Sequence, residues 1–183
     1  MVISMKKIIV IFLITFLLCG CSLKKETPSD SVEEYLLNYK SLNNNVLSEL
    51  KTMVKNTDFN DEHKEKYMEI MKKQYSNMDY KIESVTIDKN EASVGVKINV
   101  LDYFKTNRDA SAYRDSNVTE FITNGRYDQD KFDLYLLNYL EETTSKTDYL
   151  LEFKLTKEGK KWVIKNIDKT MKEKMQGIYD YNG

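Results

Sequence analysis

Residues 91–101 read EASVGVKINVL, and this stretch decides the fold. Apolar side chains occupy every second position from Ala92 to Val100, and mostly polar or small side chains stand between them. A period of two over this length predicts a β-strand with one buried and one solvated face. A lone strand leaves its backbone groups unpaired, so partner strands are expected before and after it in the sequence.

The segment before this strand predicts its first partner. The apolar residues of 80–88 change phase halfway along the segment. Such a change within a strand is typical of a β-bulge, which is expected near Glu83 and Ser84. Residues 88–91 then form the turn of an antiparallel hairpin.

A second hairpin is predicted near the C-terminal end. Aromatic and aliphatic residues alternate with polar ones over 149–155, and the sequence KEGK at 157–160 is typical of a turn. Trp162, Ile164 and Ile167 then return along the partner strand.

Helices are predicted where apolar residues recur at three- and four-residue steps. Thr27 before Pro28 is a helix start, with Asp30 placed as the acid of a capping box. The apolar stripe that follows runs as far as Met53, and the three asparagines 43–45 in its middle either weaken the helix or break it.

Further helical segments are expected from Asn60 or Asp61 onward, over 128–143, and as a last turn from Asp168 to Gly177. Residues 106–126 are expected to be polar and irregular, with a short helix near 118–123. Together these elements predict one α+β domain over 27–183. Its N-terminal helices would pack on one face of a curved antiparallel sheet, with extra helices between the two hairpins.

The first twenty residues have the pattern of a secretion signal. Lys6 and Lys7 precede an almost entirely apolar run over 8–18, which is shorter than the roughly 20 residues of a membrane-spanning helix. The alternatives are a retained N-terminal helix, or an ordinary cleaved signal with two incidental cysteines.

The segment Leu18-Cys19-Gly20-Cys21 resembles the lipobox of bacterial lipoproteins. The resemblance implies cleavage between Gly20 and Cys21 and a lipid group on the Cys21 thiol, leaving residues 1–20 as signal peptide and 21–26 as lipidated tether. The implied partner is the lipid bilayer, on the extracytoplasmic face of the cell membrane. The Lys-, Asn- and Ile-rich composition points loosely to a Gram-positive bacterium.

Processing of this kind would also restrict the chemistry of the domain. Cys19 would leave with the signal and Cys21 would carry lipid, so no thiol would remain for a disulfide, a metal site or a nucleophile. Loss of Lys6 and Lys7 lowers the basic count from 28 to 26 against 29 acidic residues. A balance so close to neutral, without a long block of one sign, gives no indication of nucleic-acid binding.

Two terminal segments carry a second resemblance. TPSDSVEEYL at 27–36 and GKKWVI at 159–164 resemble the two ends of NTF2-like lipoproteins, the kind grouped as DUF4878-type and DUF5105-type domains. The resemblance implies a cystatin-like cone whose bent sheet and helices enclose a pocket, used in some relatives for catalysis and in many for binding or assembly. The extra segment between the hairpins departs from that pattern.

Catalytic candidates are few. His63, the one histidine, stands among charged residues and is interpreted as solvated surface, so no metal site and no cofactor is expected. Asp128 and Asp130 are interpreted as capping residues. Asp102 follows Val100 in the inward phase of the central strand, where a carboxylate can serve as acid or base. The alternative is that the strand ends at Leu101 and Asp102 caps the next segment.

The thirteen tyrosines are attributed mainly to core packing. Tyr179 and Tyr181 lie beyond the last helix and form a candidate contact pair. The favoured function is a membrane-anchored surface lipoprotein with a non-catalytic binding or assembly domain, whose partner is an envelope protein or a small ligand. The alternative is an NTF2-like pocket enzyme that uses Asp102.

Overall fold

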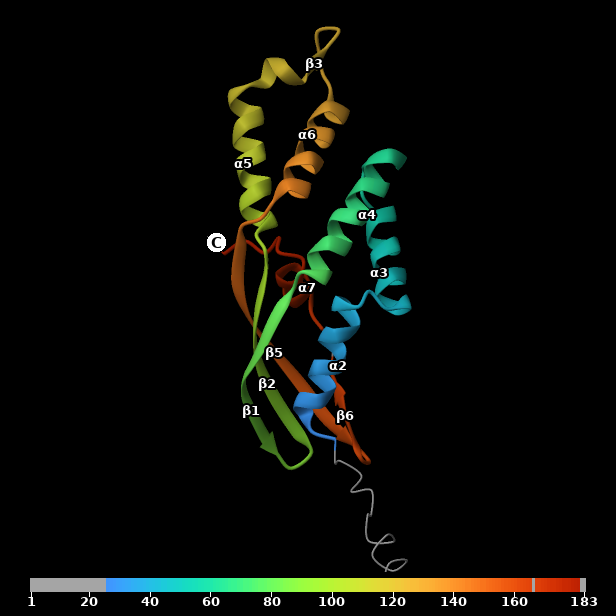
Figure 1. Ribbon diagram of the computed structural model, residues 1–183, viewed down its shortest axis with the longest axis vertical. Coiled ribbons are helices and arrows are strands. Elements are labelled where there is room, and N and C mark those ends of the chain that lie inside the picture. The colour runs from blue at the N-terminus through green and yellow to red at the C-terminus, as the bar shows by residue number, and fades with distance from the viewer. Residues whose placement is uncertain (1–25, 166, 182–183) are drawn as a thin grey trace, which may run out of the picture.

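The computed structural model describes residues 26–165 and 167–181 (Figure 1). The predicted signal peptide, the predicted cleavage site between Gly20 and Cys21 and the predicted lipidation site at Cys21 lie outside these residues. The described helices are α2 (Pro28–Lys40), α3 (Asn44–Lys55), α4 (Asp61–Ser76), α5 (Tyr103–Ser116), α6 (Gln129–Glu142), α7 (Lys169–Met175) and the 3₁₀ helix η1 (Val118–Phe121). The strands are β1 (Asp79–Asp88), β2 (Glu91–Leu101), β3 (Ile122–Thr123), β4 (Arg126–Tyr127), β5 (Lys146–Glu158) and β6 (Lys161–Ile164).

The central strand β2 pairs on both sides, which confirms the mixed helix and antiparallel-sheet prediction. The main sheet has the order β1-β2-β5-β6, and every pairing in it is antiparallel. Four consecutive inward residues of β2 are fully buried: Val94, Val96, Ile98 and Val100. Full burial of such side chains contributes roughly 1.5–3 kcal/mol each, so this face anchors the core.

Both predicted hairpins are present. The register of β1 against β2 shifts between Ile82 and Ser84, as the change of phase in the sequence predicts. Gly95 lies opposite this bulge, where an added Cβ would approach the Ser84 Oγ to 2.4 Å. A larger residue at position 95 would therefore require the Ser84 hydroxyl to rotate away.

The first predicted helix is two helices. The capping box between Thr27 and Asp30 opens α2, which packs across the sheet (Figure 1). The helix ends before Leu42, whose φ of 53° is left-handed, and Asn43 accepts a hydrogen bond from the Val46 amide to cap α3. Asn43 breaks the stripe because its side chain takes a backbone donor of the next helix, whereas Asn44 and Asn45 lie within α3.

The prediction of an irregular segment over 106–126 is wrong. Residues 103–116 form the regular helix α5, followed by η1 where the short helix was expected. The buried residues of α5 are Tyr103, Thr106 and Ala110, at steps of three and four. Two of them are small or polar, so the helical spacing is present without the apolar stripe that reveals it in the sequence.

The helices α5 and α6 pack side by side and project beyond the end of the sheet (Figure 1). Helix α6 occupies the predicted range, and Asp128 caps it by accepting a hydrogen bond from the Lys131 amide. Leu137 of this helix is fully buried, whereas Tyr139 is exposed. Helix α4 packs against α6 from the other side.

The C-terminal segment is joined to α4 by a hydrogen bond. Helix α7 lies within the range predicted for the last helical turn: Asp168 caps it, and Gly177 follows it with a φ of 69°. Gln74 of α4 is fully buried and holds this region together. Its amide donates to the carbonyls of Leu101 and Gln176, and its carbonyl accepts from the Leu101 amide.

Candidate functional site

A pocket of about 690 Å³ lies where α4, α5 and α6 meet the loop before α4 and the C-terminal segment. Its walls are lined by Thr57, Asp58, Phe59, Tyr67, Tyr103, Asn107, Gln129, Asp133, Leu136, Leu140 and Ile178. Apolar walls with a few polar groups are typical of small-ligand sites. The pocket therefore combines a surface for an apolar body with groups that can orient it.

The aromatic side of this pocket is held in place by the helices. Phe59 and Tyr67 meet edge to face with ring centroids 5.4 Å apart. The Tyr103 hydroxyl donates to the Ile70 carbonyl at 3.2 Å. Burial raises the pKa of both Tyr67 and Tyr103, so both phenols are neutral at physiological pH.

The polar side of the pocket comes from α5 and α6. Asn107 donates to the Tyr103 carbonyl at 2.6 Å, and Gln129 donates to the Asp133 carboxylate at 2.7 Å. Asp58 adds a second carboxylate to the wall. Two carboxylates and two amides favour a ligand that offers hydrogen-bond donors or positive charge.

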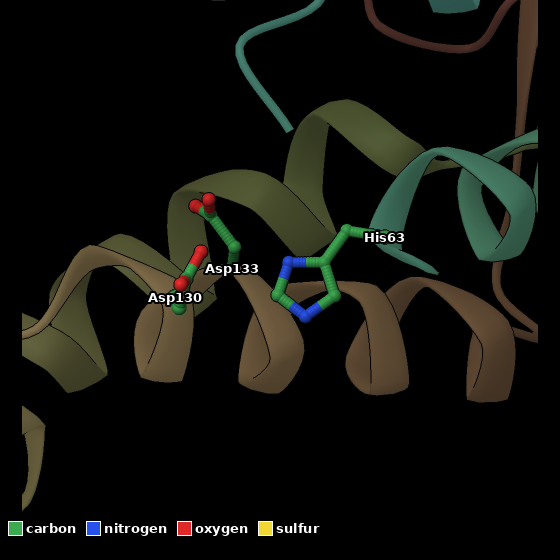
Figure 2. Close-up of side chains that lie close together, drawn as sticks. All are labelled: His63, Asp130 and Asp133. Atoms are coloured by element: carbon green, nitrogen blue, oxygen red, sulfur yellow. The ribbon is translucent and has the colours of Figure 1, made fainter. Parts of the chain in front are cut away.

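At the edge of the pocket, Asp133 also belongs to a cluster with His63 and Asp130 (Figure 2). Each residue contributes one ligand atom, and the three atoms lie within 4.8 Å of one another. Figure 2 shows the His63 ring on α4 turned toward the two carboxylates, which leave α6 one turn apart. Residues three apart on a helix share a face, which explains how both acids reach the same point.

The interpretation of His63 as solvated surface is wrong. Its side chain is 5 % exposed, because the third position of α4 faces α6 rather than solvent. Its Nδ1 is buried without a hydrogen-bond partner. An unsatisfied buried polar group costs about 1–3 kcal/mol, so this nitrogen requires an explanation.

The backbone and neighbouring amides position this cluster. Asn60 accepts a hydrogen bond from the His63 amide as the cap of α4, and its own amide donates to Asp130 at 3.2 Å. Asp130 was predicted to cap the helix, but its carboxylate instead accepts a hydrogen bond from Asn60. Asp133 was not among the residues selected from the sequence. The signal for it was the three-residue spacing of two acids at the start of a helix.

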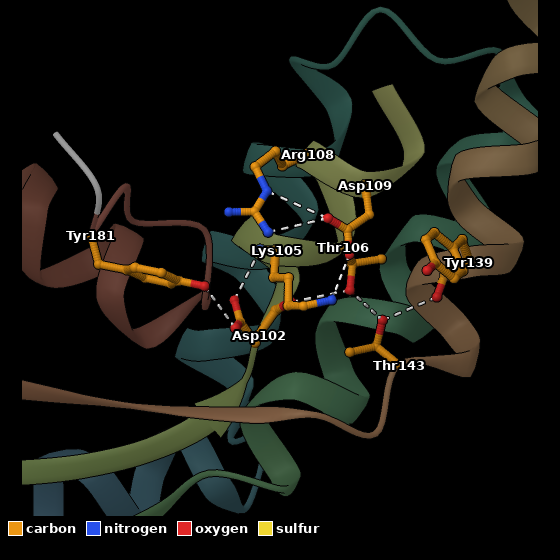
Figure 3. Close-up of polar contacts among 8 residues, drawn as sticks. All are labelled: Asp102, Lys105, Thr106, Arg108, Asp109, Tyr139, Thr143 and Tyr181. Atoms are coloured by element: carbon orange, nitrogen blue, oxygen red, sulfur yellow. Dashed lines mark hydrogen bonds and ion pairs between the residues drawn. The ribbon is translucent and has the colours of Figure 1, made fainter. Parts of the chain in front are cut away.

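Asp102 is a buried cap (Figure 3). Strand β2 ends at Leu101, and one Asp102 carboxylate oxygen accepts from the Lys105 amide at 2.9 Å to begin α5. The other oxygen accepts from the Tyr181 hydroxyl at 2.9 Å. The side chain is 6 % exposed and is not among those that line the pocket. The capping interpretation therefore holds.

Tyr179 and Tyr181, the candidate contact pair after α7, make contacts with other parts of the same domain. Besides the bond from Tyr181 to Asp102, the Tyr179 carbonyl accepts from the Tyr149 hydroxyl at 3.0 Å. The Tyr149 and Tyr179 rings also meet edge to face. These contacts attach the C-terminal segment to the sheet and to the start of α5.

A second hollow of about 420 Å³ lies between α2, α3 and α7. Here the Tyr35 hydroxyl donates to that of Tyr39, which donates to Glu49 at 3.0 Å. Lys172 stands 3.9 Å from the Glu49 carboxylate. Glu49 of this hollow is thus already paired with Tyr39 and Lys172, and the pocket beside α6 remains the stronger candidate for ligand binding.

Among the described residues, no helix is long and apolar enough to cross a membrane. No family model matches the chain, and neither a curated protein nor a solved structure shows significant similarity to it.

Proposed function

We propose that this chain is a lipoprotein of the bacterial cell envelope, anchored through acylated Cys21 on the extracytoplasmic face of the membrane, whose domain binds a small ligand. The observation that carries the proposal is the sequence Leu18-Cys19-Gly20-Cys21 after a short apolar run. The fold is proposed to be a variant of the NTF2-like cone. The helix α2 across an antiparallel sheet of two hairpins supports this relationship.

The arrangement of the domain is consistent with such an anchor. At about 3.3 Å per residue, the seven residues from Cys21 to Thr27 span no more than roughly 25 Å. The start of α2 at Pro28 lies at the opposite end of the molecule from the tip of the α5–α6 hairpin (Figure 1). The proposed anchor would therefore be attached at the end of the domain opposite the α5–α6 tip.

We favour binding over catalysis because the Asp102 carboxylate is already engaged in hydrogen bonds. Both of its carboxylate oxygens accept hydrogen bonds within the fold. The pocket between the helices instead offers aromatic walls with carboxylate and amide groups, which suit recognition of a ligand with an apolar body and hydrogen-bond donors or positive charge.

The anchor is tested by expressing Cys21→Ser beside the matched control Cys19→Ser in a Gram-positive host. Wild-type chain and the Cys19→Ser control should fractionate with membranes, and their mature forms should carry acyl groups by intact-mass measurement. The Cys21→Ser chain should lack the acyl groups. An unmodified Cys21 in the wild-type chain, or an uncut leader, would refute the anchor.

Ligand binding is tested separately by native mass spectrometry of the full chain purified in detergent from its host. We expect an additional small-molecule mass on the wild-type chain. Leu136→Trp, which fills the pocket, should lose that mass, while Leu134→Trp on the exposed side of α6 should keep it. Equal ligand content in both variants would show that the ligand binds elsewhere. This outcome does not depend on whether Cys21 is acylated.

A further inference from the structure

The buried Nδ1 of His63 is the starting observation. Among the residues that the structure describes, it is the one buried side-chain nitrogen or oxygen without a hydrogen-bond partner. It lies on the side of the ring that faces Asp130 and Asp133 (Figure 2). A neutral imidazole nitrogen of this kind carries a lone pair, which a metal ion can accept.

We propose that His63, Asp130 and Asp133 bind a divalent transition-metal ion, for which zinc is the reference. One imidazole nitrogen and two carboxylates are a ligand set that zinc and its neighbours accept, whereas calcium and magnesium prefer oxygen ligands alone. Two carboxylates also balance the charge of a divalent ion. Three protein ligands leave at least one coordination position for water or another ligand.

The surroundings of the cluster resemble those of a metal site. Metal-bound carboxylates are usually oriented by further hydrogen bonds, and here Asn60 and Gln129 supply them through their side-chain amides. Each carboxylate keeps a second oxygen for the ion. His63 and Asp133 are 5 % and 8 % exposed, so two ligands are fixed by packing.

Metal bonds to nitrogen and oxygen are about 2.0–2.2 Å long, so ligand atoms around a tetrahedral ion lie about 3.5 Å apart. The three atoms here lie within 4.8 Å of one another and must converge by about 1 Å to hold an ion. The exposed ligand is Asp130, whose side chain can turn inward without disturbing the core. A direct hydrogen bond between His63 and a carboxylate would also satisfy Nδ1, but none is formed. This site shares Asp133 with the wall of the ligand pocket, but the proposal rests neither on the lipid anchor nor on the binding of a small ligand.

The test is a zinc titration of the full chain, purified in detergent with an affinity tag that contains no histidine and stripped with a chelator. Competition with a chromophoric chelator gives the affinity. We expect one zinc ion per chain at this site. Asp130→Asn and Asp133→Asn should each weaken binding by at least about 10-fold, since loss of even an outer-shell partner costs about 10–100-fold. Glu142→Gln, an exposed change on the same helix, should bind as the wild type does.

A second measurement locates the ion without relying on variants. Because His63 is the chain's one histidine, its imidazole resonances are assigned without ambiguity. Zinc should shift them, and Co²⁺ should broaden or displace them strongly. Asp130→Asn changes an exposed residue, so it tests the site even if Asp133→Asn fails to fold. The proposal is overturned if His63 resonances do not move, or if both aspartate variants bind zinc as tightly as the Glu142→Gln control.

Discussion

Replacement of Gln74 by Met should destabilise the domain more than any surface change on the same helix. Gln74 is fully buried and joins α4 to the end of β2 and to the C-terminal segment. Met has a similar volume, so packing around position 74 changes little. The Leu101 amide and the carbonyls of Leu101 and Gln176 lose a partner in the variant.

The magnitude follows from these three hydrogen bonds. Each contributes a net of about 1 kcal/mol, and a buried group left without any partner costs about 1–3 kcal/mol. Neighbouring bonds are not additive, so we expect a loss of about 3–5 kcal/mol in the free energy of unfolding. With a urea m-value of about 2 kcal/mol/M for a chain of this size, the midpoint should fall by about 1.5–2.5 M.

The assay is urea unfolding of the full chain in detergent, followed by the fluorescence of Trp162, which is buried and is the chain's one tryptophan. Glu65→Met, an exposed change on the same helix, is the matched control and should move the midpoint by less than about 0.3 M. A Gln74→Met midpoint equal to that of the control would refute the reasoning. It would show that the three backbone groups find other partners.

Three further changes test neighbouring features. Gly177→Ala places a methyl group 2.1 Å from a backbone oxygen at a φ of 69°, so the melting temperature should fall by about 5 °C or more, and an unchanged value would contradict the described turn. Asp102→Ala removes the cap of α5 and should cost about 1 kcal/mol by urea unfolding, while Asp102→Asn should recover part of it. Burial raises the pKa of Tyr75 to about 12, so its neutral form stabilises the fold. That stability is fully present below pH 10, the ordinary pKa of an unfolded tyrosine, and is lost as the pH rises from there through 12. Tyr75→Phe should flatten the alkaline decrease in urea midpoint, and an identical pH profile would exclude this contribution.

Periodicity explains which parts of the fold could be predicted from the sequence. The β2 strand and its hairpins follow from a period of two that burial enforces on every second residue. The caps at Thr27, Asp128 and Asp168 follow from local hydrogen bonding that requires no knowledge of the tertiary structure. Helix α5 could not be predicted in this way because its buried face is polar or small except for Tyr103.

The candidate site was hidden for a related reason. His63 stands among four charged residues in the sequence, and its burial depends on α6, which begins more than sixty residues later. Asp133 lies on α6 itself and is buried where that helix packs against α4 and α5. A polar residue buried by a long-range helix contact leaves no local pattern, whereas Asp102 did, because a cap is a property of adjacent residues.

The pocket helices α5 and α6 are attached to the sheet as an insertion between two paired strands. Leu101 and Lys146 are direct partners in the β2–β5 ladder, so residues 102–145 form an insertion whose two ends meet. The Asp102 amide donates to the Ser145 carbonyl at 2.9 Å and closes the base of this insertion. The entropic cost of closing a loop grows slowly with its length. A long insertion that carries its own helices therefore destabilises the sheet little more than a short turn does. Residues of α5 and α6 at the pocket can therefore change without altering the register of the core strands.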